Sequence, residues 1–108
     1  MAFTGTLSFT TLGKNTVVGK GASLAADASG TIGNYGDTGA DEQLPENFPT
    51  LDADLTELII YQISTANNKP LSYNIAGDPL RITITNTDDT NPTGELRIRV
   101  KREHTLVL

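Results

Sequence analysis

The feature that most constrains the fold of this chain is a period-two alternation of apolar and polar residues, repeated in several short segments. In 80–85 the apolar residues Leu80, Ile82 and Ile84 alternate with arginine and threonine, and 96–101 alternates in the same way. Successive side chains of a β-strand point to opposite faces, so each segment can bury one face and expose the other. The pattern predicts antiparallel strands with one solvated face.

Other segments carry the same signal. The segment 2–12 alternates, 15–18 is a short candidate strand, and 71–75 alternates again before the turn residues of 77–79. The chain has sixteen threonines, whose β-branched side chains suit a half-buried pleated surface. Composition and patterning therefore agree on strands.

The last two alternating segments, 80–85 and 96–101, predict a β-hairpin closed by the polar loop 86–94. Six to eight strands at this spacing predict an all-β fold, a small antiparallel β-sandwich or barrel-like domain. A length of 108 residues fits a single domain over 1–108.

The segment 55–64 admits two interpretations. Leu55, Leu58 and Ile59 belong to an apolar stripe with helical spacing, but β-branched residues and threonines crowd the segment and disfavour a helix. We favour a central strand that is apolar on both faces. A short helical turn before it stays open.

The segment 19–50 is a glycine-rich, acidic stretch with few large apolar side chains. Seven of the ten glycines lie between Gly13 and Gly39. A loop of this length is unusual inside a compact domain, so either short strands are hidden in it or it is an arm ordered by another chain. We favour the arm, and expect a chain lacking 22–40 to fold but to lose its partner.

Charge is distributed unevenly. The net charge is −5, which argues against nucleic-acid binding. Between Gly21 and Asn68 there are eight acidic residues and no Lys or Arg, whereas four basic residues cluster between 97 and 102. Acidic and basic side chains are candidates for an interface, as is the apolar C-terminus, which either packs back on the domain or joins a neighbour's sheet. The candidate interface residues are Asp37, Asp41, Glu42, Arg97, Arg99, Lys101, Leu106 and Leu108.

Residues for catalysis are scarce. The chain has no Cys and one His, His104, so a nucleophile–base pair is nearly excluded and we expect no enzyme, no cofactor and no transition metal. No apolar run approaches the length of a membrane span, and 1–20 lacks the pattern of a signal peptide, so no membrane partner is expected. The loop carboxylates and the tyrosines leave a second class of function open, that of a calcium-dependent or carbohydrate-binding module.

As a whole the chain resembles the small all-β structural proteins of tailed-bacteriophage virions, of the capsid decoration or cement type. The resemblance lies in the Met-Ala-Phe-Thr start, the Thr/Gly-rich, Cys-free and acidic composition, the glycine-rich 22–40 and the closing segment 80–100. It implies a homo-oligomer, with a trimer favoured, that bridges neighbouring capsid subunits of the virion after synthesis in the host cytoplasm. Another structural component of a phage tail or fibre is the alternative within this class.

Overall fold

The computed structural model describes residues 3–63 and 65–103, and within them it contains ten β-strands and no helix. In chain order these are β1 (Phe3–Thr4), β2 (Ser8–Gly13), β3 (Thr16–Lys20), β4 (Ser23–Leu24), β5 (Ser29–Gly33), β6 (Glu42–Gln43), β7 (Thr56–Ile63), β8 (Leu71–Ala76), β9 (Arg81–Asn86) and β10 (Glu95–Arg102). None of the described residues forms a helix that could span a membrane. The predicted all-β fold is confirmed.

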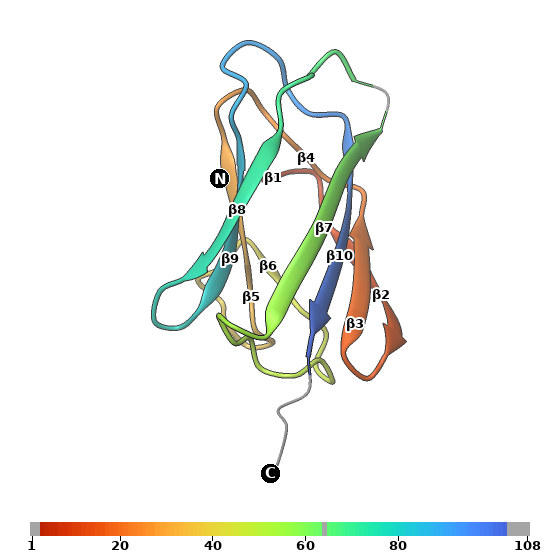
Figure 1. Ribbon diagram of the computed structural model, residues 1–108, viewed down its shortest axis with the longest axis vertical. Helices are drawn as coiled ribbons and strands as arrows, with labels where there is room; N and C mark the ends of the chain where they lie inside the picture. The colour runs from red at the N-terminus through yellow and green to blue at the C-terminus, as the bar shows by residue number, and fades with distance from the viewer. Residues whose placement is uncertain (1–2, 64, 104–108) are drawn as a thin grey trace.

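Two four-stranded sheets make up most of the molecule (Figure 1). One, which we call the β10 sheet, has the order β2-β3-β10-β7, and the other, the β9 sheet, has the order β6-β5-β9-β8. All pairings are antiparallel except β5 with β6, and the short β1 and β4 form a separate pair. The arrangement is a small β-sandwich.

The core lies between the two sheets and is built by the alternating residues of both. Leu96, Ile98 and Val100 from β10 meet Ile82 and Ile84 from β9, and all five are fully buried. Burying side chains of this size stabilises a fold by about 1.5–3 kcal/mol each. The alternation therefore identifies the inward faces correctly.

The predicted hairpin between 80–85 and 96–101 is wrong. β9 pairs with β5 and β8, whereas β10 pairs with β3 and β7, so the two strands lie in different sheets. The loop 87–94 is long enough to carry the chain from one sheet to the other. The hairpin is instead β8–β9, closed by the turn around Gly77 and Asp78.

The predicted N-terminal strand is divided in two. Gly5 adopts φ +81°, a left-handed conformation that glycine tolerates and that breaks a strand. β1 before it pairs with β4, and β2 after it forms a hairpin with β3. The Phe3 ring lies over Gly30, where a Cβ would overlap it.

The segment 55–64 forms a strand, as favoured, but β7 is an edge strand and not a central one. A single helical turn precedes it, because the Thr56 N–H donates to the Asp52 carbonyl at 3.0 Å and the Asp52 carboxylate accepts the N–H of Asp54. The strand is apolar on both faces although only its inner face packs on the core.

The stretch 19–50 contains hidden strands, the first of the two alternatives. Three of its side chains, Leu24, Ile32 and Leu44, are buried in the core, and β5 lies inside the β9 sheet between β6 and β9. The favoured interpretation as an arm that needs another chain is therefore wrong. Glycines lower the apolar content of the stretch, but a few well-placed aliphatic residues suffice to anchor it.

Candidate interaction surface

Cross-strand register brings basic and apolar side chains together on the outer face of the β10 sheet. On β10, Arg97 lies between Tyr61 of β7 and Lys20 of β3, and in the next row Arg99 lies between Ile59 and Val18. Directly opposite residues in an antiparallel pair project on the same side of the sheet. We call this surface the basic face; its members are Val18, Lys20, Ile59, Tyr61, Arg97, Arg99 and Lys101.

Two large apolar side chains of the basic face are open to solvent. Ile59 is 60% exposed and Tyr61 is 56% exposed, and they are outward neighbours on β7. An open depression of about 280 Å³ lies here, bordered by Val18, Ile59, Tyr61, Arg97, Ile98 and Arg99. Contiguous exposed apolar surface rimmed by polar groups is typical of interaction sites.

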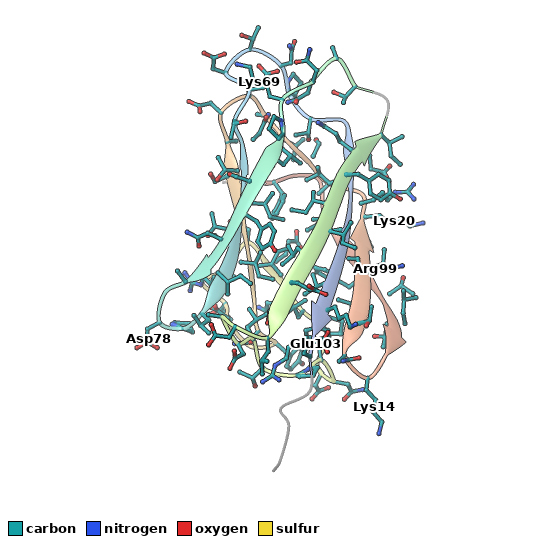
Figure 2. The ribbon with its side chains drawn as sticks, viewed as in Figure 1. Lys14, Lys20, Lys69, Asp78, Arg99 and Glu103 are labelled. Carbon is teal, nitrogen blue, oxygen red and sulfur yellow. The ribbon has the colours of Figure 1, made fainter. Side chains whose placement is uncertain are left out.

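The charges of the basic face are only partly neutralised within the chain. Arg97 pairs with Glu95 at 2.8 Å and Lys101 with Glu103 at 3.2 Å, both at exposed positions. Among the described residues, Arg99 and Lys20 make no ion pair, and both extend into solvent (Figure 2). Surface pairs of this kind contribute little to stability, so these cations remain available to a partner.

The basic face is positive on an acidic protein. It holds four basic side chains against three carboxylates, Glu57, Glu95 and Glu103, for a net charge of +1. The whole chain has −5, so the remainder carries −6. A complementary partner for this face is therefore an acidic surface, and charge complementarity sets specificity and association rate more than affinity.

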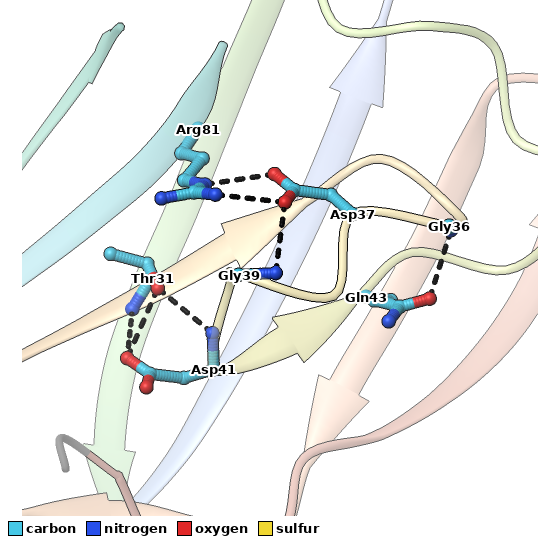
Figure 3. A network of polar contacts seen from close by, with 7 residues as sticks. All are labelled: Thr31, Gly36, Asp37, Gly39, Asp41, Gln43 and Arg81. Atoms are coloured by element: carbon cyan, nitrogen blue, oxygen red, sulfur yellow. Dashed lines mark hydrogen bonds and ion pairs between the residues drawn. The ribbon is translucent and has the colours of Figure 1, made fainter. Parts of the chain in front are cut away.

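The predicted acidic interface residues lie elsewhere, at the β5–β6 end of the other sheet (Figure 3). Both carboxylate oxygens of Asp37 accept hydrogen bonds from Arg81 at 2.8 Å, and the Asp37 side chain is only 8% exposed. Asp41 accepts from the N–H and hydroxyl of Thr31 at 2.9 and 3.0 Å. Both carboxylates hold the β5–β6 loop in place, and the structure does not bring them to the predicted basic residues.

Electrostatics in this cluster follow from those contacts. The bidentate hydrogen bonds from Arg81 hold the pKa of Asp37 below its ordinary value of 3.8, and the same pair raises the pKa of Arg81. Burial raises the pKa of Glu42, which lies on β6. Asp37 and Arg81 are 44 residues apart, so no local pattern could have paired them.

A buried amide network is the polar feature that sequence reasoning missed. Asn86 is fully buried; its side-chain oxygen accepts from Asn67 at 2.8 Å and its amide donates to the carbonyls of Ala25 and Asn91 at 3.0 and 3.1 Å. The sequence did contain a signal for the network, because position 86 continues the inward alternation of Ile82 and Ile84 on β9. A polar residue at such a position must find hydrogen-bond partners.

The loop 87–94 is organised by the same network. The Asp88 carboxylate accepts the N–H groups of Thr90 and Asn91 at 2.9 and 3.1 Å, and these bonds lower the pKa of Asp88. Within 3–63 and 65–103 no group of three or more acidic or histidine side chains could hold a metal ion. The observed role of Asp88 is to shape the loop.

Three predicted features lie outside the described residues, namely His104, Leu106 and Leu108. No protein-family model matches the chain, and no curated protein and no solved structure matches it either. The basic face is therefore the feature of this chain that bears on its function.

Proposed function

We propose that the protein is a non-catalytic structural component of a phage virion, which decorates or cements the capsid by placing its basic face on an acidic surface of the capsid subunits. The observation that carries the proposal is the exposed pair Ile59 and Tyr61 beside Arg97 and Arg99 on a chain that is otherwise strongly acidic. Aromatic residues and arginine are enriched at protein interfaces and supply most of their binding energy. The virion as the site of assembly is supported by the resemblance alone.

This proposal places binding on a sheet face and not on a glycine-rich arm. The arm hypothesis needed 19–50 to be free, whereas Leu24, Ile32 and Leu44 hold this stretch in the core. Binding through a rigid sheet avoids the entropic cost of ordering a loop, and this favours affinity. Several copies on one assembly would make individually weak contacts effective.

The experiment is co-sedimentation of the purified chain with tailed-phage capsids. We expect the wild type to bind and Arg99→Glu to weaken binding by about tenfold or more, because reversing this charge opposes an acidic partner at the centre of the face. The matched control is Lys14→Glu, the same change of charge in the β2–β3 turn, away from the basic face. Equal loss of binding in both variants would mean that net charge, and not this face, controls binding.

The same exposed Tyr61 favours one second candidate, a carbohydrate-binding module, because sugars stack on aromatic rings. A thermal shift with glycans, together with no binding to capsids, would replace the capsid proposal by this one. The Arg99→Glu variant separates the two further, since a neutral sugar has no reason to respond to the reversal of one charge.

A further inference from the structure

The backbone of β7 presents unpaired hydrogen-bonding groups along its free edge. N–H groups of a strand point alternately to its two neighbours. The N–H of Leu96 in β10 donates to the carbonyl of Ala22, on the β3 side, at 2.8 Å. The N–H of Glu103, directly after β10, donates to the carbonyl of Leu55, directly before β7, at 2.7 Å. Odd-numbered residues of β10 therefore bond to β7.

The strand register shows which residues of β7 are bonded to β10. Arg97 lies opposite Tyr61 without any shift along the strand, so the odd-numbered residues of β7 are those bonded to β10. The N–H and C=O groups of Leu58, Ile60 and Gln62 consequently point away from the sheet. The Leu58 N–H donates to the Tyr73 hydroxyl at 3.5 Å, and in the part of the chain that the structure describes, Ile60 and Gln62 have no such partner.

The other sheet edges differ from β7. β2 carries a bulge between Thr11 and Gly13, and β6 has two residues, both of which discourage edge pairing. β8 is open, but the side chains on its outer face are small or polar, as at Ser72 and Asn74. β7 has eight residues, no bulge, no Lys and no Pro, and it exposes apolar side chains on its outer face.

We infer that β7 pairs antiparallel with β7 of a second copy of this chain, about a two-fold axis beside Tyr61. The pairing joins the two β10 sheets into one eight-stranded sheet. This inference does not rest on the proposed capsid function, because it follows from the hydrogen-bonding pattern of the edge.

The register about Tyr61 follows from which groups are free. With the axis beside Tyr61, Ile60 of each copy lies opposite Gln62 of the other, and the two pairs exchange four backbone hydrogen bonds. The contact between Leu58 and Tyr73 is left intact. On the outer face Tyr61 then lies opposite its own copy and Ile59 lies opposite Ile63, so every directly opposed pair is apolar or aromatic.

Electrostatics favour this edge-to-edge arrangement over stacking of two basic faces. Neighbouring strands are about 4.8 Å apart, so β10 and its copy would be separated by three spacings, about 14 Å. This exceeds the Debye length of about 8 Å at physiological ionic strength, so Arg97 and Arg99 would not repel their copies strongly. Face-to-face stacking would bring the same cations together with no carboxylate to neutralise Arg99.

Amide hydrogen exchange on the full chain tests the pairing at single residues. The N–H groups of Ile60 and Gln62 are expected to exchange quickly in dilute solution and more slowly as concentration rises. Those of Ile59 and Tyr61, bonded to β10, should be protected at every concentration. Exchange at Ile60 and Gln62 that does not depend on concentration would overturn the inference.

Sedimentation equilibrium measures the assembly itself. We expect a monomer–dimer equilibrium that is weak, because one strand pair buries a small area. Measuring the association therefore requires protein concentrations up to about 1 mM. A chain that remains monomeric there, or that forms a trimer without a dimer, would contradict the two-fold pairing.

Charge substitutions at the axis give a matched set of variants. Tyr61→Lys should weaken the dimer by about tenfold or more, because two cations would face each other across the axis, and mixing it with Tyr61→Glu should restore association. Leu12→Lys, at a 57% exposed position on β2 of the same sheet, should leave association unchanged. Arg99→Glu should also leave association unchanged, although it is expected to weaken capsid binding. This variant therefore distinguishes failure of the dimer inference from failure of the capsid proposal. Unchanged association of Tyr61→Lys would refute the register.

Discussion

Asp37 shows how a single loop carboxylate can stabilise the fold. It lies in the β5–β6 loop, where Arg81 of β9 supplies two hydrogen bonds and the Gly39 N–H a third, at 3.2 Å. Its pKa in the folded chain is therefore lower than the ordinary value of 3.8 that applies on unfolding. A depressed folded pKa stabilises the fold above the unfolded value, and this contribution is lost as the pH falls through the folded value.

We therefore expect Asp37→Asn to be less stable than the wild type at neutral pH, with a difference that shrinks as the pH falls below the ordinary value of 3.8 and through the lowered pKa of the folded chain. Thermal unfolding at a series of pH values measures this. Asp78→Asn, in the exposed β8–β9 turn, is the control and should change stability little at any pH. A deficit for Asp37→Asn that stays constant across the series would show that the pair is not the source of the pH dependence.

Among the elements, β5 changes most between the expectation and the structure. It lies between β6 and β9 in the β9 sheet, its Ile32 is fully buried, and Gly30 allows the Phe3 ring to pack against the strand. The preceding β4 contributes the buried Leu24. The stretch 19–50, which was predicted to be an arm, is thus a structural part of the sandwich.

Deletion of 22–40 is accordingly expected to prevent folding, because it removes the inner strand β5 and the buried side chains of Ala22, Leu24 and Ile32. Far-UV circular dichroism and urea titration of the deleted chain measure the loss. In the intact dilute monomer the amides of Thr31 and Ile32 should be protected from exchange. A deleted chain that still unfolds cooperatively would return the arm hypothesis to first place.

At the scale of the whole molecule, both sheets combine segments from distant parts of the chain. β3 and β10 come from opposite ends of the chain and lie side by side in the β10 sheet. β5 and β9, which are also far apart in the sequence, pair in the β9 sheet. The loop 87–94 ties the sheets together through the network around Asn86. Neither sheet can be completed by one half of the chain.

Unfolding is therefore expected to be a single cooperative transition. In urea, the ring signals of Tyr61, on the β10 sheet, and Tyr73, on the β9 sheet, should change with the same midpoint and with a slope of about 1–3 kcal/mol per molar. NMR spectroscopy resolves the ring signals of the two tyrosines. Different midpoints would indicate that the two sheets unfold independently.

Alternation along the chain predicted the all-β class, the longer strands outside 19–50 and the outward direction of Arg97, Arg99 and Lys101, but it missed β4, β5 and β6. It could predict these features because the side-chain period of a strand is a property of the local backbone. The break at Gly5 was missed, although glycine was the residue that permits it.

Tertiary structure alone decided which strands pair and which polar groups meet. The segments 80–85 and 96–101 are equally suited to a hairpin and to separate sheets, since backbone groups pair with any strand that packing brings near. The same holds for Asp37 with Arg81 and for Asn86 with Asn67, whose contacts join distant parts of the chain. Local periodicity determines the face that a side chain occupies, whereas long-range packing determines what that face meets.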